Sequence, residues 1–132
     1  MHRHRNHVDR LGRAQPPESL KLSNTEEKNA MIHVVAVITA KPGLRESILT
    51  HFRANVPSVR AEAGCIEYGP VVDADPAPPF QTKAGTDSFL VIEKWATMDA
   101  LKAHAAAPHM VAYAAKVKDM IAVRTVHVLT AA

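Results

Sequence analysis

Four short apolar runs alternate with two longer stretches in which apolar residues recur every three or four positions. The runs cover residues 32–39, 65–72, 88–95 and 123–129, and their β-branched residues are typical of strands. The helical spacing covers residues 44–59 and 98–117. This order of elements predicts an α+β, ferredoxin-like β-α-β-β-α-β fold, in which helices cover one face of an antiparallel sheet.

Prolines, glycines and one threonine predict where these elements begin, bend and end. Pro57 removes an internal hydrogen bond and predicts a kink or break just before it in the first helix, and Gly64 predicts the end of that helix. Gly69 and the proline after it predict a bulge or a sheet edge in the second strand. Thr97 predicts the start of the second helix. Pro108 divides that helix into two segments, because the residue before a proline avoids helical geometry.

The predicted strands at residues 32–39, 88–95 and 123–129 are apolar at almost every position. Such strands are usually buried on both faces, yet the two helical stretches can cover only one. A second copy of the chain is the simplest cover for the other face. We therefore predict a homodimer whose two sheets pack against each other as a dimeric α+β barrel.

Residues 1–30 lack any periodicity, and we predict that they form a flexible or extended N-terminal arm, with the domain spanning residues 31–132. The arm carries six of the 16 Lys and Arg residues and four of the 13 Asp and Glu residues, which leaves only +1 of the net charge of +3 on the domain. This charge is too small to indicate a nucleic-acid-binding face.

No apolar run is long enough to predict a membrane span, and the amino end lacks the apolar stretch of a secretory signal. These features predict a cytoplasmic protein without a membrane partner. The single cysteine, Cys65, excludes an intrachain disulfide and a multi-thiolate metal site, and it fits a reducing compartment. We interpret Cys65 as a packed, inert thiol.

Side chains that can carry chemistry are concentrated in residues 88–117. Glu93 and Trp95 share one face of their strand. Glu93 either pairs with a basic residue or serves a site, and Trp95 either fills the core or lines a pocket. His104 lies in register with Leu101 on the apolar side of its helix. It is either a core histidine bonded to a backbone carbonyl or a base that acts on a substrate.

Three more side chains extend this group. His109 lies at a helix start, where a capping or solvent-facing role is equally open, while Tyr113 and Tyr68 can point their phenols into one cavity. His104 and His109 are five residues apart across a helix break, which is not the i, i+4 spacing of a metal pair. Fingerprints for flavin, nicotinamide or nucleoside phosphates do not occur. We therefore predict no metal and no organic cofactor.

Three sequence segments resemble those of a known family: VPSVRAEAGCIEYGPVVD, then IEKW with His104 nine residues after Trp95, and then APHMVAY. The chain is similar in these segments to the antibiotic biosynthesis monooxygenase family, and within it to bacterial quinol monooxygenases. The resemblance covers Met31 to about Leu129.

The family resemblance implies a dimeric ferredoxin-like barrel that oxygenates electron-rich aromatic compounds with O₂, without metal or flavin. It implies a cavity in each subunit for a small quinol or phenolic substrate. His104 would be the proton acceptor, and Trp95 and Tyr113 would be ring-stacking walls. Tyr68 and His109 would form hydrogen bonds to the substrate. We place Glu93 with them among the substrate-binding residues, with a role that is structural rather than catalytic.

Two alternative functions remain open on the same fold. The domain could isomerise a small metabolite without consuming O₂, or it could bind an aromatic ligand without catalysis. Relatives that degrade haem use an asparagine on the first strand and a haem-ligating histidine on the later helix. The matching positions here are Ala36 and a position near Ala114. Haem degradation is therefore not expected.

Overall fold

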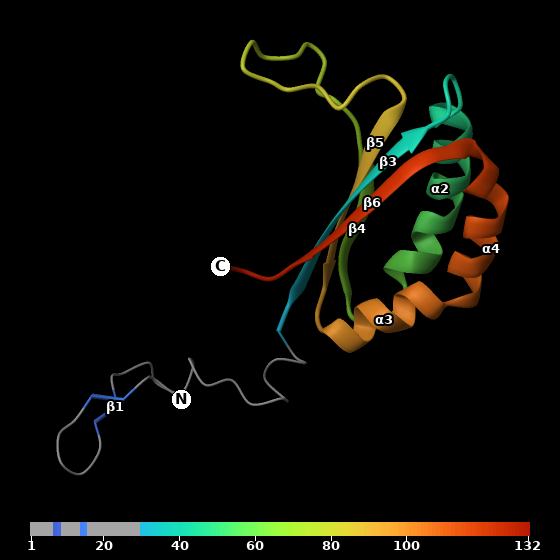
Figure 1. Cartoon of the computed structure of the whole chain (residues 1–132). Coiled ribbons are helices and arrows are strands. Elements are labelled where there is room, and N and C mark those ends of the chain that lie inside the picture. Colours follow the sequence, from blue (N-terminus) through green and yellow to red (C-terminus); the bar gives the residue numbers. More distant parts are fainter. Residues whose placement is uncertain (1–6, 9–13, 16–29) are drawn as a thin grey trace.

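The computed structural model of the chain describes residues 7–8, 14–15 and 30–132. Its main sheet has four antiparallel strands in the order β4-β5-β3-β6, with the helices on one face (Figure 1). This is the predicted ferredoxin-like β-α-β-β-α-β topology. The strands are β3 (Ile32–Ala40), β4 (Cys65–Val71), β5 (Ser88–Trp95) and β6 (Ile121–Leu129), and the helices are α2 (Arg45–Arg60), α3 (Met98–Ala106), α4 (Pro108–Val117) and the short 3-10 helix η2 (Lys118–Met120).

Two short strands precede the domain. β1 (His7–Val8) pairs antiparallel with β2 (Ala14–Gln15). The remaining residues up to position 29 lie outside the described part of the chain. The predicted N-terminal arm falls mostly on these residues and stays a prediction.

Alternation along the strands separates an inner face, under the helices, from an outer face. On β3 every second residue is buried, from Ile32 to Ala40, and the residues between them are half-buried. On β5 the residues from Phe89 to Trp95 also alternate between buried and half-buried, and Glu93 and Trp95 lie on the buried face, as predicted. The core is completed by the buried side of α2 and by one residue of α4: Ile48, Leu49, Phe52, Val56, Val59 and Val117.

The predicted interruption of the second helical stretch is confirmed. Thr97 caps α3, since its hydroxyl accepts a hydrogen bond of 3.0 Å from the backbone N–H of Ala100. Ala107 is extended (φ −63°, ψ 139°), and α4 begins at Pro108. Proline suits this first helical position because the N–H that it lacks would have no partner there. The short break turns α4 onto a new axis after α3 (Figure 1).

The first helix neither breaks at Pro57 nor ends at Gly64. Pro57 does not break α2, which continues to Arg60. The missing N–H costs one hydrogen bond, but Val56 and Val59, which are 8% and 0% exposed, hold the last turn against the core. Gly64 does not terminate the helix either. It adopts the expected positive φ of 83°, but in the turn that follows the helix.

β4 lies at the edge of the sheet, as Gly69 and Pro70 predicted, although the register irregularity falls between Cys65 and Glu67. The connection between β4 and β5, residues 72–87, arches away from the helices (Figure 1). Asp73 closes its base by accepting hydrogen bonds of 2.8 Å and 2.9 Å from two consecutive backbone N–H groups at the other end of the loop.

The helices leave the β6 side of the sheet open. β6 begins at Ile121, two residues before the predicted start, and its inner-face residues Val126 and Val128 are 41% and 48% exposed. The described residues include no helix that is both long and apolar enough to cross a membrane.

Candidate active site

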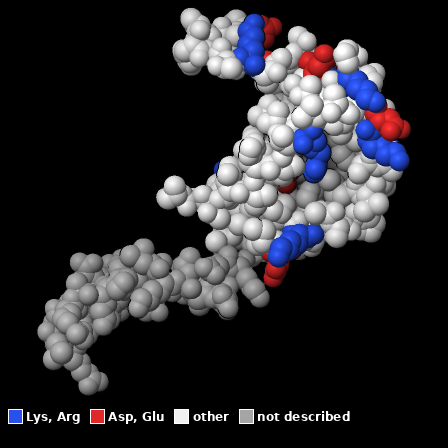
Figure 2. Space-filling model, in the orientation of Figure 1, with Lys and Arg blue, Asp and Glu red and all other residues white. Residues whose placement is uncertain are grey.

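A cavity of about 500 Å³ lies between the inner face of the sheet and the helices. Figure 2 shows the molecule hollowed between these layers, with few charged side chains in the hollow. The cavity wall is mainly apolar, and it includes five residues with ionisable side chains: Tyr68, Glu93, His104, Tyr113 and Arg124. The structure therefore brings four of the six predicted site residues into one cavity wall.

Glu62 connects His104 and His109, two of the predicted site residues. The His104 Nδ1 atom lies 3.0 Å and 3.2 Å from the two carboxylate oxygens of Glu62. The His109 Nε2 atom lies 2.6 Å from one of the same oxygens. The side chains of His104, Glu62 and His109 are 6%, 14% and 30% exposed, respectively. A largely buried carboxylate thus holds the cavity histidine on one side and a more exposed histidine on the other.

The turn after α2 places Glu62 beside His104. Gly64 in this turn approaches α3 so closely that a Cβ atom on it would lie 2.6 Å from the Cβ atom of Ala100. Its carbonyl also accepts a hydrogen bond of 2.8 Å from the N–H of Ala96. His104 lies one helical turn after Ala100 on α3. Close packing of the turn against α3 therefore brings the Glu62 carboxylate within reach of the imidazole.

Glu93 and Trp95 form a buried pair at the end of β5. The indole Nε1–H of Trp95 donates a hydrogen bond of 2.8 Å to Glu93. Burial raises the pKa of the Glu93 carboxyl, although the indole hydrogen bond and the nearby charges of His104 and Arg124 oppose this shift. This carboxyl is therefore held in a structural pair.

Trp95 does not line the cavity. Its side chain is 0% exposed, and its ring centroid lies 4.6 Å from that of His104. The indole thus packs behind the imidazole, which it holds from one side. The predicted role as a ring-stacking wall for the substrate does not match this position, and we assign Trp95 to the support of His104.

Tyr68 and Tyr113 are held by Phe52, a core residue on α2. The Phe52 and Tyr68 rings stack with centroids 5.2 Å apart, and Tyr113 meets Phe52 edge-on at 5.9 Å. Burial raises the pKa of Tyr68 well above its usual range and raises that of Tyr113 to about 12. Both phenols are therefore protonated at neutral pH and can donate hydrogen bonds into the cavity.

Arg124 provides the cation in the cavity wall. It lies on β6 opposite Ile38, on the inner face of the sheet. Within the described part of the chain its guanidinium forms no salt bridge. Its charge favours the ionised forms of both Glu93 and Tyr113, although burial dominates the pKa of each. An anionic ligand in the cavity would be attracted by the positive charge of Arg124.

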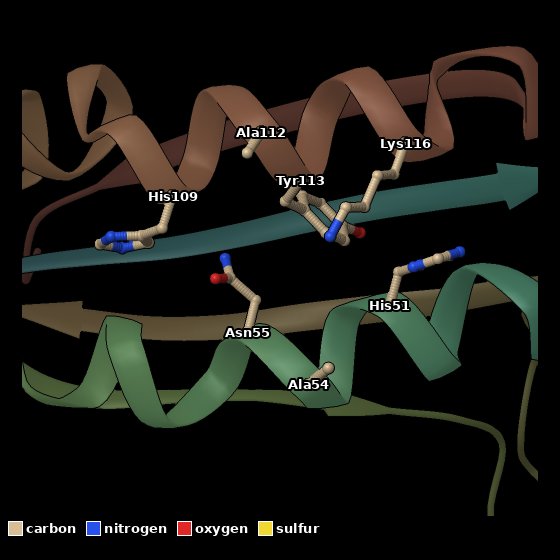
Figure 3. A pocket seen from close by; sticks show the side chains of 7 residues that line it. All are labelled: His51, Ala54, Asn55, His109, Ala112, Tyr113 and Lys116. Carbon is tan, nitrogen blue, oxygen red and sulfur yellow. The ribbon is translucent and has the colours of Figure 1, made fainter.

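A smaller pocket, of about 180 Å³, lies in a groove between α2 and α4. Figure 3 shows side chains of α4 facing those of α2 across it. His109 lines this groove and not the cavity, so the structure separates it from the expected substrate position, whereas Tyr113 lines both spaces. The polar lining residues are His51, Asn55, His109, Tyr113 and Lys116.

The surroundings of Cys65 agree with the interpretation of this residue as an inert thiol. Burial, followed by the charges of Glu62 and Glu93, raises the pKa of the Cys65 thiol, which disfavours the reactive thiolate. Ala36 and Ala114 both line the cavity, and a methyl group cannot ligate a metal. In the part of the chain that the structure describes, no group of three or more His, Cys, Asp or Glu side chains is arranged to hold a metal ion.

Sequence reasoning missed Glu62 and Arg124, although each had a signal. Glu62 follows the C-terminal end of α2, where the helix dipole favours cations. An acid at that position therefore indicates a partner elsewhere in the fold. Arg124 alternates with Val126 and Val128 on one face of its strand. A basic residue on a face that is otherwise apolar is a candidate for a cavity wall.

The fold and the cavity define a class of ferredoxin-like α+β domain that can receive a small molecule between its sheet and its helices. The sequence model of one family, antibiotic biosynthesis monooxygenase, matches residues 31–116. The chain belongs to this family.

Individual relatives agree with this assignment. The chain is 38% identical over 101 residues to the probable quinol monooxygenase YgiN of Escherichia coli, a match that covers 75% of this chain and 96% of that protein. Among solved structures, it resembles PA3566 from Pseudomonas aeruginosa (26% identity, 80% and 97% coverage, TM-score 0.66). It also shares its fold with Rv0793 from Mycobacterium tuberculosis (24% identity, 78% and 96% coverage, TM-score 0.65).

Proposed function

We propose that the chain is a cofactor-independent monooxygenase that oxidises a small quinol or phenol with O₂. The observation that carries this proposal is the position of His104, whose Nδ1 atom is occupied by Glu62 while the side chain lines an apolar cavity. The family assignment and the name of the Escherichia coli relative support the reaction class. The cavity of about 500 Å³ has the size of a small-molecule site.

The proposed reaction begins with a proton transfer from a ring hydroxyl of the substrate to the His104 Nε2 atom. The resulting anion is electron-rich enough to pass an electron to O₂. For a hydroquinone such as menadiol, one oxygen atom then enters the ring and the other leaves as water. The product is a hydroxyquinone. The four electrons that reduce O₂ all come from the substrate, so the reaction needs no further reductant.

The other cavity residues would favour the anion in this scheme. The guanidinium of Arg124 supplies a positive charge, and the phenols of Tyr68 and Tyr113 supply hydrogen-bond donors. The hydrogen bonds of the two phenols are stronger in an apolar cavity than in water, whereas Arg124 is exposed and solvent partly screens its charge. Trp95 would support His104 from behind, and Glu93, which lines the cavity, would hold the Trp95 indole through its hydrogen bond.

Oxygen uptake with menadiol or a related hydroquinone tests the proposal in the wild-type chain and in His104→Ala. A positioned base contributes about 10²–10⁴-fold to a rate, so we expect kcat/KM to fall by that factor. His51→Ala is the matched control, because this histidine lines the groove and not the cavity. We expect the control to retain wild-type activity. Equal rates in wild type and His104→Ala would remove His104 as the base.

The same experiment separates the alternative functions. A chain that is stabilised by quinones in a thermal-shift assay but consumes no O₂ would be a binding module. A chain that converts a small metabolite without O₂ uptake would be an isomerase.

The proposal includes a homodimer. The outer face of the sheet carries no helix, and its centre is apolar, although polar residues such as His33, Lys94 and His127 surround that centre. A second copy packed on that face would remove it from water and leave both cavities intact, because each cavity lies on the opposite side of its own sheet.

A further inference from the structure

We infer that Glu62 and His109 are positioning residues for the His104 base: Glu62 fixes the ring tautomer of His104, and His109 fixes Glu62. This inference rests on the proposed function, because it explains how His104 presents a free lone pair to the cavity. Glu62, which sequence reasoning missed, thereby receives a role. The role of His109 changes from a substrate contact to a support for Glu62.

The tautomer follows from the hydrogen bonds of the imidazole. A neutral histidine has one N–H and one lone pair, and the partner of one nitrogen decides which nitrogen has the proton. The Nδ1 atom of His104 lies 3.0 Å and 3.2 Å from the Glu62 carboxylate oxygens, so Nδ1–H donates to them. The lone pair is then on Nε2, which has no hydrogen bond within the described part of the chain and can accept a substrate proton.

The ring cannot easily adopt another orientation. The His104 side chain is 6% exposed, with the Trp95 ring centroid at 4.6 Å and the Tyr68 ring centroid at 5.4 Å from that of the imidazole. Two aromatic walls and one carboxylate therefore restrain a single histidine. When the substrate proton arrives on Nε2, the negative charge of Glu62 stabilises the imidazolium that forms.

His109 completes this arrangement from the opposite side of the carboxylate. Its Nε2–H donates to Glu62 at 2.6 Å. A carboxylate with two N–H donors from α3 and α4 is held in one orientation, whereas a carboxylate with one donor can rotate away from His104. Because Glu62 is only 14% exposed, water cannot readily replace a lost donor.

Glutamine at position 109 provides a matched variant. Its side-chain Nε2 donates from nearly the same distance along the side chain as the imidazole Nε2, so His109→Gln retains the hydrogen bond and His109→Ala removes it. We expect His109→Ala to lower kcat/KM by about 10–100-fold, the effect of one hydrogen bond to a charged group. We expect His109→Gln to recover most of this loss. Glu62→Gln removes the charge and should lower kcat/KM by about 10²-fold or more.

Nitrogen-15 NMR of the histidine rings tests the inference without turnover. Spectra are recorded above pH ~8, where an ordinary histidine is neutral. In the wild type we expect His104 to have its proton on Nδ1. In Glu62→Gln we expect a mixture of tautomers or the opposite tautomer, and in His109→Ala a partial change that His109→Gln reverses. If Glu62→Gln does not fold, Glu62→Asp takes its place, because it keeps the charge but has a shorter side chain.

The outcomes distinguish this inference from the proposed function. An unchanged His104 tautomer in Glu62→Gln, or in Glu62→Asp if Glu62→Gln does not fold, overturns the inference, whatever the rates are. A changed tautomer with wild-type rates also overturns it, because the tautomer would then not matter to catalysis. A wild-type chain that oxidises no hydroquinone, but whose His104 tautomer depends on Glu62 as described, contradicts the proposed function and leaves the positioning role supported.

Discussion

Burial shifts three acidic groups in the cavity wall toward their protonated forms: the carboxyl of Glu93 and the phenols of Tyr68 and Tyr113. Protonated phenols are donors and poor bases at neutral pH. Glu93 already accepts the indole hydrogen bond of Trp95. Among the cavity residues, His104 is therefore the best suited to accept a proton. The protonated groups in the wall also favour the binding of an anionic ligand.

The raised phenol pKa values can be measured directly, because Tyr68 and Tyr113 are the two tyrosines of the chain. In the folded protein we expect little tyrosinate absorbance at pH ~10, where unfolded tyrosine is half ionised. The pKa of Tyr113 is about 12, and that of Tyr68 is raised further. Spectrophotometric titration of native and urea-unfolded protein checks this prediction. Half-ionisation of either phenol near pH ~10 in the native protein would contradict it.

The same shifts predict how stability depends on alkaline pH. Both phenols bind their protons more tightly in the folded state than in the unfolded state. The stability that they contribute is therefore fully present below pH ~10 and is lost as the pH rises toward the folded values.

The turn between α2 and β4 is the element that couples the sheet edge to α3 and orients the site. Gly64 has a φ of +83°, and Ala100 on α3 occupies the space where a side chain would project. Gly43 has a similar φ of +81°, but no atom lies within 4 Å of the position that a Cβ atom would take there. A side chain at Gly43 would therefore cause backbone strain alone, whereas a side chain at Gly64 would cause backbone strain and a steric clash.

Alanine substitutions at these glycines give a matched prediction. Gly43→Ala adds only the strain of a left-handed conformation, about 1 kcal/mol. Gly64→Ala adds the contact with Ala100 as well, so we expect a loss of about 2–4 kcal/mol. We also expect Gly64→Ala to weaken hydroquinone oxidation by moving Glu62. Urea unfolding of the three proteins measures the stability differences, and equal losses for both variants would argue against steric exclusion at Gly64.

Local patterns predicted the elements and their faces. The alternation of Phe89, Val91, Glu93 and Trp95 on β5 appears in the burial of that strand, because side-chain direction in a strand follows from the backbone alone. Pro57 shows the limit of this reasoning, since tertiary burial of its neighbours outweighs one missing hydrogen bond. Glu62 shows another limit: its partners are 42 and 47 residues away. A local sequence pattern does not identify the distant histidines that a turn will contact.

At the scale of the whole molecule, helices cover only one face of the sheet, and the uncovered outer face has an apolar centre. The outer face includes central residues of β3 and β5, such as Val35 and Ile92, which are direct partners across the two strands. Toward its edges it includes Val71, Val123 and Leu129, which are 45%, 56% and 45% exposed. Contiguous apolar surface of this kind indicates an interaction site.

The loop between β4 and β5 carries a further exposed apolar residue. Phe80, near its tip, is 89% exposed. The loop arches away from the helices (Figure 1). A partner seated on the outer face would therefore lie on the side toward which this loop extends, and we expect the loop to contribute contacts to the homodimer.

A charge at the centre of the outer face tests the homodimer. We expect Ile92→Lys to dissociate it, because the two-fold symmetry would bury two unpaired ammonium groups in one interface. A penalty of about 3 kcal/mol or more raises the dissociation constant by more than ~100-fold. Ala103→Lys is the control, since this position is exposed on α3, away from the outer face. Sedimentation equilibrium should show a dimer for the wild type and for Ala103→Lys and a monomer for Ile92→Lys. A monomeric wild type would contradict the dimer, and a dimeric Ile92→Lys would place its interface elsewhere on the molecule.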